Sequence, residues 1–468
     1  MTGTSQQPPT DAPPGVSGRI FGPQWRALTV GILAVVSLLA FEAMAVATAM
    51  PVAVRDLDGL PFYAWGFSAF FIASLVAMVV SGEVCDRRGP VLPFVVSLVL
   101  FVIGLVVAGL ATSMVMFVAG RALQGVGAGL NIVALYVVVG RLYPDSLRPR
   151  LFSVMASAWV IPAIVGPSVA GVVADELSWR WVFLAVPPLV LPAVALMLPR
   201  LHGLGAAPGV EAVRSRTLPA LAVAGGVASL QYAGQRLDTL SWALAPVGIA
   251  LLVVGLPRLM PVGIFRARRG LPTAVLMRGV LAGAFFGAET FVPLMLVEER
   301  GLATALAGLT LTAGAVSWSI GSWIQGRPGV TTPRHVLVQR GTALVAVGVG
   351  GVSLGLWSAL PPAVAGVGWA IGGLGMGLAM SSTSVVVLAL SPVAEQGLNS
   401  AALQLSDALG TILFVGIGGA LFAGLHTENG SNTAAFLTIY LVMATVAAVG
   451  VTLAGRIAVP ERVPAGTR

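Results

Sequence analysis

Long stretches of this chain carry no charged side chain: residues 89–120 and 341–394 contain no Asp, Glu, Lys or Arg. Over the whole chain 57% of residues are hydrophobic and 9% are charged, whereas about a quarter of the residues in soluble domains are charged. This much apolar surface exceeds what a water-soluble core can bury, so the excess has to face lipid. Helices satisfy their own backbone hydrogen bonds inside a bilayer, and each needs about 20 apolar residues to cross it. The sequence therefore predicts an all-α polytopic membrane protein.

Dividing the chain at its charges and turn residues gives fourteen segments of that length. The break in the first uncharged stretch lies at residues 111–113, and the break in the second lies at residues 360–362. The predicted spans are residues 27–50, 62–82, 90–111, 114–140, 152–174, 180–199, 217–234, 239–257, 271–297, 304–325, 337–360, 362–391, 398–424 and 433–456. The seventh and eighth are the shortest, and without them the chain would have twelve spans in the same orientation.

The distribution of arginine predicts the orientation. With a cytoplasmic N-terminus, 21 of the 26 basic residues fall in inside loops and tails, and Arg121 lies within a span. Four fall in outside loops, namely Arg55, Arg180, Arg236 and Arg300. The positive-inside rule then places both termini in the cytoplasm, with the protein in the cell inner (plasma) membrane. The same bias explains the net charge of +8 without a nucleic-acid partner.

The chain divides into five predicted regions. Residues 1–24 form a disordered cytoplasmic tail without a removable signal peptide, and residues 25–200 form an N-terminal six-helix bundle. Residues 201–270 hold a cytoplasmic loop, two extra spans and a basic loop, residues 271–457 form a C-terminal six-helix bundle, and residues 458–468 form a second tail. The arginines from Arg258 to Arg278 mark the basic loop. Its apolar residues fit either a short helix on the inner leaflet or a plain loop.

Repeated motifs indicate that the two bundles are internal duplicates. Gly82-Glu83-Val84-Cys85-Asp86-Arg87-Arg88-Gly89 follows the second span, and a weaker version without the Asp, Gly321 to Arg327, follows the tenth. The fourth span carries Gly125, Gly127 and Gly129, and the twelfth carries Gly373, Gly375 and Gly377. Paired repeats with a site between them are typical of alternating-access transporters.

These motifs resemble the major facilitator superfamily, and within it the fourteen-helix drug:proton antiporter branch. The segment from Gly82 to Gly89 is similar to the loop signature between helices two and three. The fourth span carries Arg121-x-x-Gln124-Gly125-x-Gly127, and the fifth carries Gly166-Pro167 with Gly171, which resembles the antiporter signature. Trp179-Arg180-Trp181-Val182-Phe183 resembles the start of helix six. Pro90-Val91 departs from the basic pair that normally closes the loop signature.

Intramembrane charges are costly, at least about 2.5–3.5 kcal/mol each on insertion scales, and each one needs a reason. Glu42 lies nine residues before Pro51, where the branch usually has an Asp, and Arg121 lies at a similar depth. We expect the two to pair. Glu42 is then either a proton-coupling carboxylate controlled by Arg121, or half of a static ion pair between helices one and four.

Asp407 shares one helical face with Ser400, Gln404 and Thr411, because their spacing is four, three and four. This polar stripe favours a cavity-lining, proton-binding role, with interhelical hydrogen bonding as the alternative. Arg121, Gln124 and Asn131 form a second stripe on helix four, which predicts that this helix also lines the cavity.

Glu289 lies among Phe285, Phe286 and Phe291, a setting that suits recognition of a lipophilic cation. The alternative is a carboxylate close enough to the outer surface to be solvated. The predicted substrate cavity contains Glu289, Gln124, Asn131, Gln404, Phe285, Phe286 and Thr411.

The resemblance implies a cytoplasmic gate formed by Gly82, Asp86, Arg87, Gly89 and Arg141. Asp86 would face the N-terminus of helix thirteen near Asn399 and Ser400, where the helix dipole favours an anion, with Arg141 as its charge partner. Simple capping of the loop is the alternative. Gly166-Pro167 is expected to bend helix five, because proline removes a backbone donor; tight packing through small residues is the other reading.

No cofactor, metal site or enzyme motif is expected. His202, His335 and His426 lack metal-ligand spacing, and no GxxxxGK[ST] phosphate loop exists to bind ATP. The leading interpretation is a monomeric, proton-driven exporter of amphipathic cations, because three intramembrane acids against one base give a cavity charge of −2. Export of a lipid or lipid-linked molecule is an alternative, and a non-transporting sensor or scaffold on a transporter fold is a weaker one.

Overall fold

The computed structural model describes residues 19–58, 62–201, 203–205, 216–235, 239–302, 304–425 and 431–458. Every secondary-structure element in these ranges is a helix, which confirms the all-α prediction. The first half contains α1 (Arg26–Asp56), α2 (Tyr63–Arg88), α3 (Val91–Gly109), α4 (Met114–Leu142), α5 (Arg148–Ser157), α6 (Val160–Glu176), α7 (Trp179–Leu184) and α8 (Val186–Met197), followed by the 3-10 helix η2 (Leu198–Arg200).

The second half follows a helical hairpin of α9 (Thr217–Gln235) and α10 (Thr239–Leu259). It contains α11 (Leu271–Glu289), α12 (Val292–Glu298), α13 (Thr304–Gln325), α14 (Arg334–Val352), α15 (Ala363–Leu390), α16 (Gln396–Leu425) and α17 (Thr433–Ala454). The basic loop after α10 contains one 3-10 turn, Ile264–Arg266, and exposes the apolar side chains of Val262 and Phe265.

Twelve helical segments of the described chain are long and apolar enough to cross a membrane. The other two predicted spans coincide with α9 and α13, which are helical but are not among those twelve. The eighth predicted span, which looked weak from its length, does qualify as Thr239–Leu259. Hydropathy in α13 is lowered by Gly, Ser and Thr side chains, which are small enough for close helix packing.

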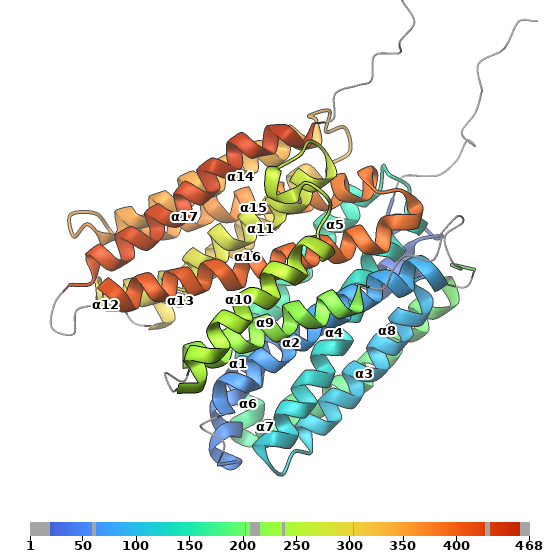
Figure 1. Ribbon diagram of the computed structural model, residues 1–468, viewed down its shortest axis with the longest axis horizontal. Helices are drawn as coiled ribbons and strands as arrows, with labels where there is room; N and C mark the ends of the chain where they lie inside the picture. Colours follow the sequence, from blue (N-terminus) through green and yellow to red (C-terminus); the bar gives the residue numbers. More distant parts are fainter. Residues whose placement is uncertain are drawn as a thin grey trace, which may run out of the picture.

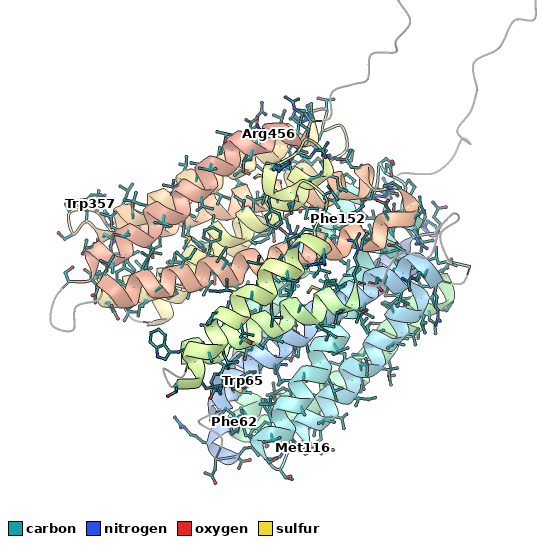
Figure 2. All side chains as sticks on the ribbon, in the orientation of Figure 1. Phe62, Trp65, Met116, Phe152, Trp357 and Arg456 are labelled. Carbon is teal, nitrogen blue, oxygen red and sulfur yellow. The ribbon has the colours of Figure 1, made fainter. Side chains whose placement is uncertain are left out.

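The helices form two groups that meet at one end of the molecule and diverge toward the other (Figure 1). At the end where they meet, α1, α11, α14 and α16 begin and α2, α4 and α13 end. We call this end the basic face, because it carries Arg87, Arg141, Arg148, Arg334 and Arg456. At the divergent end, Trp357 of the second half lies far from Phe62 and Met116 of the first half (Figure 2).

Residues before α1 are part of the fold from residue 19 onward. Ile20 is fully buried, and its carbonyl accepts a hydrogen bond from the Thr29 hydroxyl at 2.6 Å. The predicted N-terminal tail therefore includes structured residues at 19–24, while residues 1–18 lie outside the described chain. Of the predicted C-terminal tail only residue 458 is described.

Two glycines allow the halves to touch at the basic face. A Cβ atom on Gly82 of α2 would lie 2.7 Å from the carbonyl oxygen of Gly397, and a Cβ atom on Gly397 of α16 would collide with the Gly82 carbonyl. Nearby, the Gln325 amide of α13 donates to the Pro149 carbonyl of α5 at 3.0 Å. Closure therefore depends on backbone-to-backbone approach at one crossing and on a neutral hydrogen bond at the other.

We expect Gly82→Leu to hold the basic face open, because the new side chain cannot fit against the Gly397 backbone. Spin labels at exposed Arg88 and Val393, in a Cys85→Ser background, measure the separation of the halves. The distance distribution should move to longer values in Gly82→Leu. Gly416→Leu on α16 is the control, because a Cβ atom there meets nothing within 4 Å, and an equal shift in both variants would contradict the explanation.

Candidate functional site

A buried ion pair joins α1 to α4 in the first half. Arg121 donates hydrogen bonds to the Glu42 carboxylate and to the Gln124 side-chain oxygen, and its Nε donates to the Gly66 carbonyl of α2 at 3.1 Å. Its guanidinium also lies 4.7 Å from the centre of the Phe70 ring. Glu42 is 2% exposed and Arg121 is 4% exposed. The structure thus brings together the two side chains that the sequence predicted to pair.

The rest of the helix-four stripe packs between helices instead of facing an open space. The Asn131 amide donates to the Ser97 hydroxyl of α3 at 3.0 Å. Gln124 is fully buried and Asn131 is 1% exposed. In this conformation Gln124 supports Arg121, and Asn131 makes the interhelical hydrogen bond that is common in membrane proteins.

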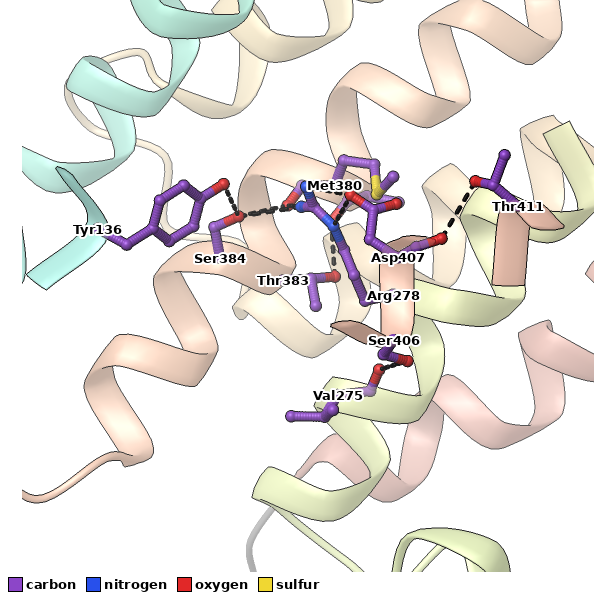
Figure 3. Close-up of polar contacts among 10 residues, drawn as sticks. Tyr136, Val275, Arg278, Met380, Thr383, Ser384, Ser406, Asp407 and Thr411 are labelled. Carbon is purple, nitrogen blue, oxygen red and sulfur yellow. Dashed lines mark hydrogen bonds and ion pairs between the residues drawn. The ribbon is translucent and has the colours of Figure 1, made fainter. Parts of the chain in front are cut away.

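A second buried ion pair joins α11 to α16 in the second half. The Nε and one terminal nitrogen of Arg278 both donate to Asp407 Oδ2, at 3.1 and 3.0 Å (Figure 3). The other terminal nitrogen donates to the Ser384 hydroxyl at 3.1 Å and to the Met380 carbonyl at 3.2 Å. Arg278 was assigned to the basic loop, and that assignment is wrong. It lies inside α11, within the span Leu271–Glu298.

The stripe around Asp407 changes from buried to partly exposed along α16. Ser400 is fully buried and Gln404 is 6% exposed, whereas the Asp407 side chain is 22% exposed. Thr411 is also partly exposed, and its hydroxyl donates to the Asp407 carbonyl at 3.1 Å. The exposed fraction therefore increases along α16 away from the basic face, where the N-terminus of this helix lies and the two halves meet.

Glu289 ends α11 near a cluster of four aromatic rings. Phe285 stacks on Trp369 of α15 with ring centres 4.2 Å apart, and both Phe285 and Phe286 contact Trp318 of α13. Phe286, Trp318 and Glu289 are partly exposed. The two tryptophans were not predicted. They are separated from Phe285 by more than thirty residues, so only the packing of α11, α13 and α15 shows that they meet.

The glycine repeats give the register between the two halves. Cβ atoms on Gly125 and Gly129 would collide with α2, and Cβ atoms on Gly373 and Gly377 would collide in the same way with α13. Counting back four residues from the first glycine of each repeat gives Arg121 in α4 and Trp369 in α15. The position that holds the ion-pair arginine in the first half therefore holds an aromatic ring in the second.

The predicted gate residues meet at the basic face. The Asp86 carboxylate accepts hydrogen bonds from the backbone N–H groups of Gly397 and Leu398 at 2.8 and 2.9 Å, at the start of α16. Arg141 lies 3.9 Å from Asp86 and donates to the Cys85 carbonyl at 3.1 Å. The predicted approach to this helix end is observed, although the partners are Gly397 and Leu398 instead of Asn399 and Ser400.

The two remaining gate residues, Gly89 and Arg87, lie at the C-terminal end of α2. Gly89 has a φ of 87°, a backbone conformation that favours glycine, and a Cβ atom there would collide with the Leu204 carbonyl. Arg87 is exposed on the last turn of α2.

The fifth predicted span is interrupted at Ala158-Trp159, between α5 and α6. Helix α6 runs on through Gly166 and Pro167. A Cβ atom on Gly166 would lie 3.2 Å from the Met44 Cβ of α1, so close packing against α1 is observed at this glycine. The bend at Gly166-Pro167 stays a prediction.

Within the described chain, twelve helical segments long and apolar enough to cross a membrane, with a buried ion pair in each half, define a polytopic membrane protein. The chain matches the Major Facilitator Superfamily over residues 31–372, and it belongs to this family. Its members are transporters and not enzymes.

Curated relatives and a solved structure agree with this membership. The multidrug transporter protein MdtP of Bacillus subtilis is 27% identical over 321 residues, which cover 64% of this chain and 57% of MdtP. The probable multidrug-efflux transporter Rv1634 of Mycobacterium tuberculosis is 27% identical over 439 residues, 89% of this chain and 91% of Rv1634. The crystal structure of the human organic anion transporter MFSD10 has the same fold, with a TM-score of 0.69, 12% identity and coverage of 92% and 99%.

Removing one member of the Glu42–Arg121 ion pair should lower the free energy of unfolding, because the other member is left unmatched. Glu42→Gln or Arg121→Met alone leaves an unmatched buried group, which costs about 3–5 kcal/mol in buried pairs. The double variant removes both charges, so its loss of unfolding free energy should be smaller than the sum of the two single losses. Thermal unfolding in detergent measures this difference, and strictly additive losses would show that the two side chains do not interact.

Proposed function

We propose that this protein is a proton-coupled antiporter that exports amphipathic, cationic small molecules by alternating access. The observation that carries the proposal is a buried carboxylate–arginine pair in each half, Glu42–Arg121 and Asp407–Arg278. Carboxylates are expensive in the membrane and can exchange a proton. Protonation changes the charge of each pair, so it has a different free energy in different conformations and can shift their populations.

A cationic substrate is supported by Glu289 and the aromatic rings beside it. Cations are attracted to the faces of Trp, Tyr and Phe rings, and partly exposed Phe286 and Trp318 offer such faces. Counting Arg278 among the intramembrane charges changes the expected net charge from −2 to −1, because three carboxylates now face two arginines. The relatives named as multidrug transporters are consistent with a broad, amphipathic substrate class.

The proposed topology has fourteen spans, with the basic face in the cytoplasm of the inner (plasma) membrane and the protein acting as a monomer. Helix α12 ends at the divergent end of the molecule and α14 begins at the basic face, so α13 has to connect the two. Its 22 residues extend about 33 Å at 1.5 Å per residue, which is enough to cross. Helix α9 has 19 residues and pairs with α10 as a hairpin, which supports two extra spans between bundles 25–200 and 271–457.

Proton coupling is tested with ethidium transport into everted membrane vesicles. We expect uptake in the wild type to stop when the pH gradient is collapsed. Glu42→Gln and Asp407→Asn should lose gradient-driven uptake by about tenfold or more but keep exchange of labelled for unlabelled ethidium, because exchange needs no net proton movement. Gradient-independent uptake in the wild type would contradict proton coupling, and lipid transport without drug transport would favour the lipid exporter.

Charge selection is tested at Glu289. Glu289→Gln removes the negative charge and keeps the size, so the KM for ethidium should rise several-fold while transport of an uncharged amphipathic substrate changes little. Glu176→Gln, outside the second half, is the matched control. An equal loss for charged and uncharged substrates would mean that Glu289 does not select cations.

A further inference from the structure

The two ion pairs differ in what surrounds them. Every partner of Arg121 described above, Glu42, Gln124, Gly66 and Phe70, belongs to α1, α2 or α4 in the first half. Arg278 and Asp407 lie in the second half, but their hydrogen bonds continue to a residue of the first. The second pair is therefore placed to respond to the distance between the halves.

The hydrogen bonds of this connection meet at one hydroxyl group on α15, and the Tyr136 hydroxyl also interacts directly with Arg278. Ser384 accepts a hydrogen bond from Arg278, and its own oxygen lies 3.1 Å from the Met380 carbonyl, to which it donates. The Tyr136 hydroxyl of α4 lies 3.4 Å from the same Ser384 oxygen. Because Ser384 has one proton and gives it to Met380, Tyr136 acts as the donor. Figure 3 shows the resulting line from Tyr136 through Ser384 and Arg278 to Asp407.

Both ends of this line are held in position. Tyr136 is 7% exposed, and its ring lies 5.0 Å from the ring of Phe152 on α5. Asp407 uses only Oδ2 toward Arg278, while Oδ1 has no hydrogen-bond partner among the described residues. This oxygen is itself buried, and it can take a proton without the loss of a hydrogen bond to the described residues.

We infer that Arg278, Ser384 and Tyr136 form an interbundle relay through which the charge state of Asp407 controls closure at the basic face. Arg278 is a positioning residue in this relay. The inference rests on the proposed function, because it assigns the step by which proton binding would change the open face.

The direction of the effect follows from the charge of Arg278. Ionised Asp407 neutralises the guanidinium and leaves it bonded to Ser384, the residue that Tyr136 contacts when the halves are closed. Protonated Asp407 leaves a buried positive charge without a counter-ion, which favours conformations where water reaches it. Protonation therefore favours separation of the halves at the basic face.

Other titratable groups on the packed helices lie elsewhere along them. On α2 these are Glu83, Cys85, Asp86, Arg87 and Arg88, near the start of α16, and Tyr63 at the opposite end of the helix. On α4 they are Arg121, which pairs with Glu42, and Arg141, and on α14 they are Arg334, His335 and Arg340, in its first two turns. Gly397, which binds Asp86, is ten residues before Asp407, about 15 Å along the helix. Glu289 of α11 lies toward the divergent end, and Tyr440 lies on α17. None of these is among the hydrogen-bond partners of Arg278 described above.

The test measures conformation, so it does not depend on transport. Spin labels at Arg88 and Val393 in the Cys85→Ser background report the closed and open populations at the basic face at neutral pH. We expect Asp407→Asn to raise the open-to-closed ratio, and Tyr136→Phe to raise it about two- to tenfold, the range for one hydrogen bond. Ser384→Ala should act as Tyr136→Phe does. Tyr440→Phe is the matched control, because the buried Tyr440 hydroxyl has no partner among the described residues.

The decisive observation is the combination of variants. If the relay exists, Tyr136→Phe should change the ratio much less in the Asp407→Asn background than in the wild type. Equal effects in both backgrounds, or a shift of Asp407→Asn toward the closed state, would overturn the inference. A relay that works in a protein whose transport ignores the pH gradient would instead reject the proposed function and leave the relay standing.

Discussion

Charge buried inside an apolar, membrane-spanning fold is the constraint on which the rest of this structure depends. Arg121 and Arg278 each need several acceptors: Arg121 finds them on α1, α2 and α4, and Arg278, which lies on α11, finds them on α15 and α16. An arginine fork that satisfies its donors in this way fixes the relative position of the helices that supply the acceptors. Gly125 and Gly129 allow α4 to approach α2 closely, and Gly279 and Gly410 allow α11 to approach α16, which are two of the helix pairs that these side-chain bonds join. Charge and small residues therefore act together in each half.

The two halves are duplicates in packing and different in chemistry. Their glycine repeats contact equivalent neighbours, yet Trp369 occupies the place of Arg121. The ion pair of the first half joins α1 to α4, whereas that of the second half joins α11 to α16. An aromatic group in place of the guanidinium removes the need for a carboxylate partner at that site. Glu289 has no ion-pair partner among the described residues.

The sequence predicted features that depend on composition and local spacing, and it failed where distant helices decide. Uncharged segments gave the helices, and the equal depth of Glu42 and Arg121 gave their pairing. Arg278 was misassigned because neighbouring arginines suggested a loop, although the predicted span 271–297 already contained it. Trp318 and Trp369 have no local polar pattern, so nothing along the chain marks them. Asn131 fitted a cavity-lining stripe by spacing, but its partner Ser97 lies on another helix and could not be read from that pattern.

Two of the contacts between the halves at the basic face are chemically unequal. At the α2–α16 crossing the carboxylate of Asp86 binds the N-terminus of α16, and at the α5–α13 crossing the neutral amide of Gln325 binds the Pro149 carbonyl. An ionised acceptor makes a stronger hydrogen bond than a neutral one, and Asp86 is only 6% exposed, so dissolved ions screen it little. The α2–α16 seam is therefore the more strongly held of the two.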